Sequence, residues 1–370
     1  MFKLPAYQEL SKEQDTINNL PLDGRHLIVG PPGTGKTVIA IYRAEMCKKK
    51  SMSSQFIVFN HTLRQYLNTA VSEKKVESQT TTYHSWFYSW YARNFHDNVP
   101  QISDYNPDWQ AIHKNISKKT GYEKFDHLII DEGQDLDKYF YLVLPQVANN
   151  ITVFADENQR LHDTNSTIDD IKMFLGVNGT HNLTRNYRNS LPIAKIARCF
   201  YAGLPSGIPE LPERKGSLPR LILGRDFYSQ MDLIAQAANN YPDYSTGVFF
   251  KTQKEQKEAL RALKARVKDS VNVQAYMYNH KNHKNINFNK NGVFILTYKS
   301  AKGLEFDTVF IPNLQKLRTD ANVIDEKMTL YVLTSRARNF LYLLTSNDDI
   351  PGLMRSVPED LYRIHGKKSG

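Results

Sequence analysis

One stretch of the chain has the residue types and the spacing of a phosphate-binding loop. Its eight residues are Gly30, Pro31, Pro32, Gly33, Thr34, Gly35, Lys36 and Thr37. Glycines allow a tight turn whose backbone N–H groups converge on an anion, and the lysine can then reach the β- and γ-phosphates. The hydroxyl of Thr37 is a ligand for Mg²⁺. These residues predict a nucleotide site, and the alternative is a chance glycine-rich turn.

The flanking sequence supplies the elements that must position this loop. Apolar residues 26–29 precede it and predict a buried strand, and a helical pattern runs from residue 38 to residue 50 after it. A loop between a strand and a helix lies at the helix N-terminus, whose partial positive charge favours phosphate. This context favours the phosphate site over the chance turn.

Two adjacent carboxylates follow a second apolar run. Asp131 and Glu132 come directly after residues 127–130, which read His-Leu-Ile-Ile. An acidic pair at the end of a buried strand is typical of a Walker B segment. There the first carboxylate holds the water shell of Mg²⁺ and the second polarises the attacking water. The alternative is a solvated loop.

Other polar side chains follow further predicted strands. Asn60 and Thr62 lie at the end of the strand at 55–60, and Gln159 follows the strand at 151–156, from which it could sense the γ-phosphate. Parallel sheets place ligands at the carboxyl ends of their strands. The segment with Asn60 and Thr62 could equally be an ordinary turn between a strand and a helix.

An aromatic stripe follows the next predicted strand end. Its members recur at helical spacing and are Tyr83, Trp86, Phe87, Trp90 and Tyr91. Such a stripe indicates a buried helix face rather than a base-stacking platform. Tyr83 and its neighbour His84 lie at the turn into the helix, so they are the better candidates for contacts outside the protein.

Composition narrows the class of protein. The chain has 370 residues, 41% of them hydrophobic and 23% charged, which is ordinary for a soluble globular protein of two domains. Its net charge of +10 favours a polyanionic partner, nucleic acid first.

Apolar runs are too short to cross a bilayer, and residues 1–20 do not resemble a signal peptide. Two distant cysteines predict no disulfide framework, so we expect a cytoplasmic protein with no membrane partner. His280 and His283 lack cysteine or carboxylate neighbours and do not predict a metal site.

The order of predicted elements indicates an α/β protein with two domains. In the second half, strands are expected at 218–223, 246–250, 272–278, 292–298, 307–313 and 340–346, with helices at 226–240, 252–268 and 325–338. This alternation predicts a second open parallel sheet, without a phosphate loop of its own. We expect domains at 1–184 and 185–370, with a small insertion at about 92–124, and a frayed basic tail at 365–370.

Taken together and in this order, the segments resemble superfamily 1 helicases of the UvrD/Rep/PcrA type. The matching motifs lie at residues 10–15, 30–37, 58–67, 82–85, 131–135, 155–159, 186–190, 297–306 and 331–337. The resemblance spans nearly the whole chain. It implies two RecA-like P-loop NTPase domains, each a largely parallel sheet flanked by helices, with ATP and Mg²⁺ bound in the cleft between them.

The resemblance also implies roles around that ATP. The first domain would supply Lys36, Glu132 and Gln159 for catalysis, with Thr37 and Asp131 at the metal. The second would supply Arg188 and Arg336 to the γ-phosphate, where positive charge stabilises the transition state. Tyr187 would stack on adenine and Glu305 would accept from the ribose. Gln14 would read the adenine edge, although a capping-box role with Ser11 explains it equally. Residues implied to line a single strand are Asn60, Thr62, Tyr83, His84, Thr297 and Lys299.

Several positions depart from the family pattern. Lys299 stands where histidine is usual, Ala155 replaces a glycine, and residues 160–164 lack the family's aromatic Gly-Trp-Arg stretch. The two accessory subdomains, which grip duplex in that family, have little sequence to occupy. The resemblance therefore supports ATP hydrolysis and movement more firmly than strand separation.

Three functions are compatible with the sequence. The first is an ATP-dependent translocase or helicase on single-stranded nucleic acid, DNA more than RNA, moving 3′ to 5′. The second is an ATP-driven switch or motor subunit that acts with a protein partner such as a nuclease. The third, a small-molecule kinase, explains the phosphate loop but leaves Arg336, Glu305 and the second sheet without a role.

Overall fold

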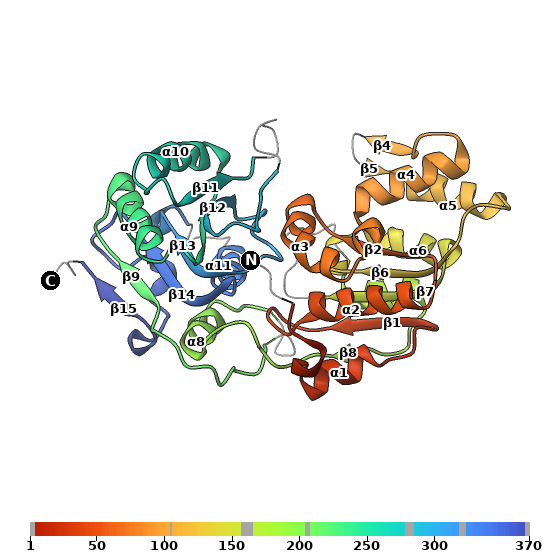
Figure 1. Cartoon of the computed structure of the whole chain (residues 1–370), viewed down its shortest axis with the longest axis horizontal. Helices are drawn as coiled ribbons and strands as arrows, with labels where there is room; N and C mark the ends of the chain where they lie inside the picture. The colour runs from red at the N-terminus through yellow and green to blue at the C-terminus, as the bar shows by residue number, and fades with distance from the viewer. Residues whose placement is uncertain are drawn as a thin grey trace. The chain divides into compact units, whose positions relative to one another are not determined.

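The chain forms two α/β units. The computed structural model describes residues 4–103, 106–156, 166–203, 208–277, 285–317 and 323–366. These divide after Thr184 into two compact parts, which we name the N-terminal unit and the C-terminal unit and describe separately (Figure 1). Each is a parallel sheet flanked by helices, so the predicted fold class of two RecA-like domains is confirmed.

The N-terminal unit is built on a six-stranded sheet in the order β3-β2-β6-β7-β1-β8, whose paired strands run parallel. Its strands are β1 (Arg25–Val29), β2 (Ser54–Val58), β3 (Thr80–Thr82), β6 (Phe125–Ile130), β7 (Ala148–Ala155) and β8 (His181–Asn182). The central strands are largely buried on both faces, as in a sheet covered by helices on both sides. The strands expected at 26–29, 127–130 and 151–156 are confirmed in β1, β6 and β7, and the strand expected at 55–60 is β2, which ends at Val58.

Helices follow most of these strands. They are α1 (Lys12–Asn18), α2 (Lys36–Lys49), α3 (His61–Glu73), α4 (Tyr83–Phe95), α5 (Trp109–Lys118), α6 (Lys138–Val147) and α7 (Ile168–Leu175). A short hairpin of β4 (Gln101–Ser103) and β5 (Asn106–Pro107) separates α4 from α5, and α5 contacts α6. The region at 92–124 therefore holds the end of α4, the hairpin and α5.

The aromatic stripe on α4 is buried, as expected. Phe87 and Trp90 are fully buried, and the ring of Tyr83 lies 4.8 Å from that of Phe140, centroid to centroid. Tyr83 is only 5% exposed, so the expectation that its side chain is open to outside contacts is wrong. Because α4 begins at Tyr83, this residue shares the inward helix face with Phe87 one turn later.

The C-terminal unit is built on a seven-stranded sheet in the order β11-β12-β10-β13-β14-β9-β15, again with parallel pairing. The strands are β9 (Arg220–Ile222), β10 (Ser245–Phe250), β11 (Asn272–Ala275), β12 (Gly292–Thr297), β13 (Phe306–Ile311), β14 (Ala337–Leu344) and β15 (Arg363–His365). The helices are α8 (Leu191–Cys199), α9 (Phe227–Asn240), α10 (Gln253–Lys264) and α11 (Val323–Thr334). The predicted second parallel sheet is confirmed.

Several expected elements of this unit differ at their ends: the helix expected at 252–268 ends at Lys264, the strand at 272–278 ends at Ala275, and the strand at 340–346 spans Ala337–Leu344. The helix expected at 325–338 ends at Thr334, because the chain turns with the Arg336 N–H donating to the Leu333 carbonyl, and β14 begins at Ala337. The tail expected to fray from residue 365 begins inside β15, which adds an edge strand. Residues 367–370 of that tail lie outside the described residues. Within the described part of the chain, no helix is long and apolar enough to span a membrane.

Candidate nucleotide site

The phosphate loop joins the carboxyl end of β1 to the first turn of α2. Gly33 and Gly35 have φ of 87° and 90°, in the left-handed region that favours glycine. A Cβ atom on Gly35 would lie 2.3 Å from Gln14 Nε2, so a side chain at this position would displace the Gln14 amide. Among the described residues, no side chain caps α2. Its first N–H groups are therefore suited to an anion.

The ammonium group of Lys36 lies within this loop. The Lys36 side chain is 8% exposed, and its Nζ donates to the carbonyl of Gly30 and, at 3.1 Å, to that of Pro31. Asp156 Oδ2 is 3.8 Å from the same nitrogen. The loop thus holds a buried cation beside the uncapped end of α2, an arrangement that fits the phosphates of ATP.

Thr37 meets the first Walker B carboxylate. Its Oγ1 donates to Asp131 Oδ2 at 2.7 Å, which joins the start of α2 to the end of β6. Asp131 is 1% exposed, and burial together with the charge of Glu132 raises its pKa to about 7. A hydroxyl and a carboxylate side by side are the hard oxygen donors that Mg²⁺ prefers, so the pair fits this metal.

Glu132 is held in position by a neighbour that the sequence argument did not single out. Its φ of 55° is left-handed, a strained conformation for a residue with a side chain. Gln134 Nε2 donates to Glu132 Oε2 at 2.6 Å, and Gln134 Oε1 accepts from the Asp156 N–H at 2.9 Å. Gln134 is fully buried. Its amide therefore connects the ends of β6 and β7 while it orients the carboxylate.

The side chain of Gln14 contacts both the N-cap of α1 and the phosphate loop. Its Oε1 accepts from the Ser11 N–H at 3.0 Å and its N–H donates to Ser11 Oγ, which confirms the predicted capping box. Its Nε2 donates to the Thr34 carbonyl at 3.0 Å, inside the phosphate loop. Gln14 therefore supports the loop directly, and its contact with adenine stays a prediction.

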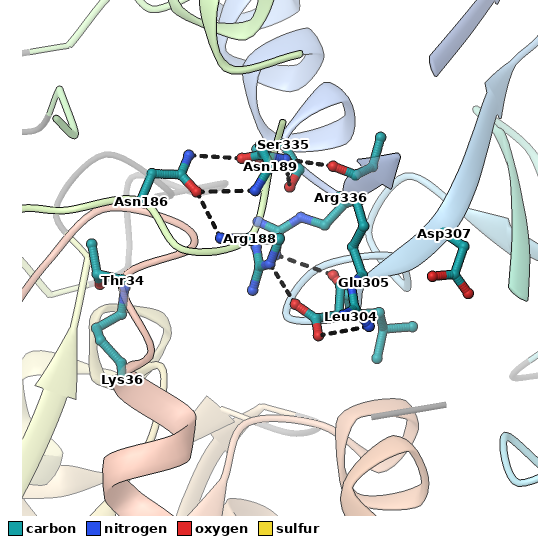
Figure 2. A network of polar contacts seen from close by, with 12 residues as sticks. Thr34, Lys36, Asn186, Arg188, Asn189, Leu304, Glu305, Asp307, Ser335 and Arg336 are labelled. Atoms are coloured by element: carbon teal, nitrogen blue, oxygen red, sulfur yellow. Dashed lines mark hydrogen bonds and ion pairs between the residues drawn. The ribbon is translucent and has the colours of Figure 1, made fainter. Parts of the chain in front are cut away.

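In the C-terminal unit Glu305 lies just before β13, with Arg188 beside it (Figure 2). Arg188 Nε lies 2.7 Å from Glu305 Oε2, and Arg338 lies 4.0 Å from Oε1. Burial alone would raise the pKa of Glu305, but these two charges hold it below its usual value. Arg188 thus has a carboxylate partner within its own unit.

The loop that carries Arg188 is fixed by asparagines. Asn186 Oδ1 accepts from the N–H groups of Arg188 and Asn189, at 2.9 and 3.1 Å. Asn189 Nδ2 donates to the carbonyls of Ser335 and Ala337, at 3.0 and 2.5 Å, which ties the loop to the turn before β14 (Figure 2). This turn carries the second predicted arginine.

Arg336 is 1% exposed and bonds to carbonyls. Its Nε donates to the Val332 carbonyl at 2.9 Å, and its guanidinium reaches the Leu304 carbonyl at 3.5 Å. Tyr187, predicted to stack on adenine, is 41% exposed. The structure thus brings Arg336, Arg188 and Glu305 to one end of the unit.

Arg214 is a positioning residue that the sequence argument missed. It donates to Asn339 Oδ1 and to the carbonyl of Arg188, each at 2.7 Å, and also to the carbonyl of Arg338. It comes from an extended segment between α8 and β9 that has no helical or strand pattern. Only the folded chain reveals its contacts.

The residues implied for nucleic acid have mixed surroundings. Thr62 is 2% exposed, and Asn60 Oδ1 caps α3 by accepting from the Leu63 N–H at 2.7 Å. His84 and Lys299 are exposed. Thr297 Oγ1 lies 2.9 Å from Ser300 Oγ. Gln159, His280 and His283 lie outside the described residues. Among the described residues, no group of three or more histidine, cysteine or acidic side chains could hold a metal ion.

Two family models match separate parts of the chain. Residues 14–164 match the family model of an AAA domain, and residues 250–348 match that of a UvrD-like helicase C-terminal domain. One similar solved structure is the C-terminal domain of a possible DNA helicase from Lactobacillus plantarum WCFS1. It is 26% identical, with a TM-score of 0.36, and the match covers 48% of this chain and 97% of that chain. No curated protein matches.

The two parallel sheets and the phosphate loop define a P-loop NTPase with two RecA-like domains. In its two matched regions the chain is similar to an AAA domain and to the C-terminal domain of UvrD-like helicases. Its domains indicate an ATP-dependent nucleic-acid helicase activity.

Proposed function

We propose that the protein is an ATPase that moves 3′ to 5′ along single-stranded nucleic acid, DNA in preference to RNA. The observation that carries the proposal is the contact between Thr37 and Asp131, with Glu132 next in sequence. This contact supports the proposal because it joins the start of α2 to the end of β6 at the carboxyl end of one parallel sheet. We further propose that the protein works in the cytoplasm.

In this proposal each group of the N-terminal unit has one task. The N–H groups of the loop and the ammonium of Lys36 bind the phosphates. Thr37 and Asp131 would hold Mg²⁺, which when bound neutralises phosphate charge. Glu132 orients the attacking water and accepts its proton, and Gln134 keeps its carboxylate in place. Gln159 senses the γ-phosphate.

The C-terminal unit adds positive charge to the same nucleotide. Arg188 and Arg336 stabilise the charge that develops on the γ-phosphate. Tyr187 stacks on the adenine, with Gln14 at its edge, and Glu305 accepts from the ribose. Because Glu305 holds Arg188 at 2.7 Å, we expect this pair to separate when ATP binds. Hydrolysis then depends on a rearrangement of this unit.

We propose that the single strand follows exposed residues at the strand ends. Lys299 and His84 are exposed, and Asn60 and Thr297 are half-buried beside their turns. A lysine meets phosphate as a point charge, so contacts of this type follow the backbone rather than the base sequence. Thr62 and Tyr83 are buried and support these positions from within.

A second candidate function is an ATP-driven switch or motor subunit with a protein partner such as a nuclease. It is favoured by a cavity of about 640 Å³ between the β4–β5 hairpin, α5 and α6, which apolar and polar side chains line together. Three apolar side chains on its rim are exposed: Ile102 at 72%, Tyr139 at 44% and Leu142 at 36%. Exposed apolar surface of this kind is typical of a protein contact.

The two candidates differ in whether the purified protein moves by itself. The test measures ATP-dependent release of streptavidin from single-stranded DNA biotinylated at either end. A 3′-to-5′ motor speeds release from the 5′ end, and the Lys36→Ala variant should not. Release only from the 3′ end would reverse the direction. ATP hydrolysis without release from either end would favour the partner-dependent switch.

A further inference from the structure

The positive charge of the protein is concentrated in its second half. Residues 185–370 contain 29 lysines and arginines against 17 acidic residues, whereas residues 1–184 contain 19 against 21. The excess is densest at 251–268, which holds seven basic and two acidic residues. This segment comprises α10 and its two flanking turns.

Four of these basic residues form one face of α10. Lys254, Lys257, Arg261 and Lys264 follow one another at intervals of three, four and three, so they lie along one side of the helix. All four are exposed. We name them the α10 basic face. The opposite side of the helix faces the core through buried residues, which are Gln256, Ala259, Leu260 and Leu263.

No acidic side chain that the structure describes neutralises the α10 basic face. Within the described residues, none of its four cations forms an ion pair, whereas Lys251 and Lys316 do. Lys251 Nζ lies 2.7 Å from Glu326 Oε1, and Lys316 Nζ lies 2.6 Å from Glu255 Oε1. Glu255 is therefore turned away to another partner, and Glu258 is the one acidic residue of α10 left to offset the four positive charges. Four exposed cations on one rigid helix side attract a polyanion.

Helix α10 begins at the carboxyl ends of the strands, where nucleic acid is proposed to bind. In the parallel register Phe250 of β10 lies beside Thr297 of β12, and the Tyr298 N–H donates to the Phe250 carbonyl at 3.0 Å. Lys251 and the start of α10 therefore share this edge with Lys299. From there the α10 basic face runs back along the flank of the sheet over about 15 Å.

We propose that the α10 basic face binds the phosphate backbone of the duplex that adjoins the single strand. The inference rests on the proposed function. Single-strand surfaces stack bases on aromatic side chains, but α10 has no aromatic residue. The lysine and arginine side chains of the α10 basic face suit contacts with phosphates. Duplex DNA offers such contacts along its backbone, independently of base sequence. Its continuity with the edge that holds Lys299 favours nucleic acid over an acidic protein.

The test compares binding to two DNA probes by fluorescence anisotropy across a salt series. One probe is a duplex with a single-stranded tail, and the other is the single strand alone. The test variant carries Lys254→Gln, Lys257→Gln, Arg261→Gln and Lys264→Gln. The control variant removes the same charge from exposed sites on α8 and near the C-terminus, through Lys195→Gln, Arg198→Gln, Arg355→Gln and Arg363→Gln.

We expect the test variant to bind the tailed duplex about 30-fold more weakly, with a salt slope smaller by about 3, as the loss of three to four phosphate contacts implies. The control variant and the single-strand affinity should change by less than about threefold. A third variant, with Lys254→Arg, Lys257→Arg and Lys264→Arg, should bind as the wild type does. Thermal unfolding by circular dichroism verifies that each variant is folded.

Equal duplex affinity and salt slope in the test and control variants would overturn the inference and leave the proposed function standing. Loss of affinity in the arginine variant would also overturn it, because the charge is still present there. If the wild-type protein binds neither probe, the proposed function itself fails. These outcomes are separable because the wild-type protein is measured first.

Discussion

The two units place their proposed sites differently on their sheets. In the N-terminal unit the phosphate loop, Asp131 and Asn60 all follow the carboxyl ends of strands, so nucleotide and nucleic-acid groups share one edge. In the C-terminal unit Glu305 and Arg336 come just before β13 and β14, at the amino edge. The proposed nucleic-acid residues of that unit follow β12, at the opposite edge.

This difference separates the two activities within the C-terminal unit. Six residues of β13 span about 20 Å between its edges. A change at Arg188 can reach the nucleic-acid edge only through the packed sheet and its helices. The N-terminal unit has no such separation. Substitutions should therefore have mixed effects in the N-terminal unit and separable effects in the C-terminal unit.

The largest expected effect is at the phosphate loop. Lys36→Ala removes the cation that meets the β- and γ-phosphates, and kcat for ATP hydrolysis should fall at least about 10³-fold. The matched control is Lys49→Ala at the other end of α2, where the side chain is 70% exposed. Steady-state hydrolysis measures both. Near-normal turnover in the Lys36 variant would remove this loop from the mechanism.

The next effect tests the arginine cluster. Arg188→Ala should lower kcat by about 10²- to 10³-fold, since an arginine at a transferring phosphate is worth at least this much. DNA binding should change little, because the cluster lies at the amino edge. Arg338→Ala is the control, as this residue also neighbours Glu305 but at 4.0 Å. Equal losses in both variants would mean that the cluster supports the fold rather than the reaction.

A smaller effect is expected at the amide that positions Glu132. Gln134→Leu keeps the side-chain size but removes the amide that donates to Glu132 Oε2 and accepts from the Asp156 N–H. We expect about a tenfold loss in kcat with KM unchanged, and a loss of about 1–3 kcal/mol in the free energy of unfolding. A stability loss with unchanged kcat would show that Gln134 acts only on the fold.

The smallest expected effect is at Lys299, which follows the carboxyl end of β12. Lys299→Ala removes one exposed cation, so single-stranded DNA should bind about fivefold more weakly, with a salt slope smaller by about 0.7. Anisotropy over a salt series measures both quantities. The result to set beside it is that of Arg188→Ala, which should leave this slope unchanged. A reversed pattern would contradict the assignment of the two edges.

Much of this site could be predicted because its signals are local. The phosphate loop is one continuous segment between a strand and a helix, and the capping box at Gln14 spans four residues. The alternation of strands and helices likewise indicated both sheets. In these segments the backbone geometry depends on residues that are close together in the sequence, so the residue pattern predicts it.

The missed features depend on which strands become neighbours. Gln134 reaches Asp156 only because β6 pairs with β7. Arg214 lies in a segment without a periodic pattern, and its three partners come from distant parts of the chain. Tyr83 was misread because its position at a turn suggested exposure, whereas helix α4 buries it against α6. Tertiary contacts decide each of these cases.

The most direct test of the central claim is steady-state ATP hydrolysis with no nucleic acid, with single-stranded DNA and with single-stranded RNA. The Glu132→Gln variant, which removes the proposed base but keeps the side-chain size, is measured beside the wild type. We predict strong stimulation by single-stranded DNA, weaker stimulation by RNA, and at least about a 10²-fold loss in the variant. Hydrolysis that neither polymer stimulates, or that survives in the variant, would contradict the claim.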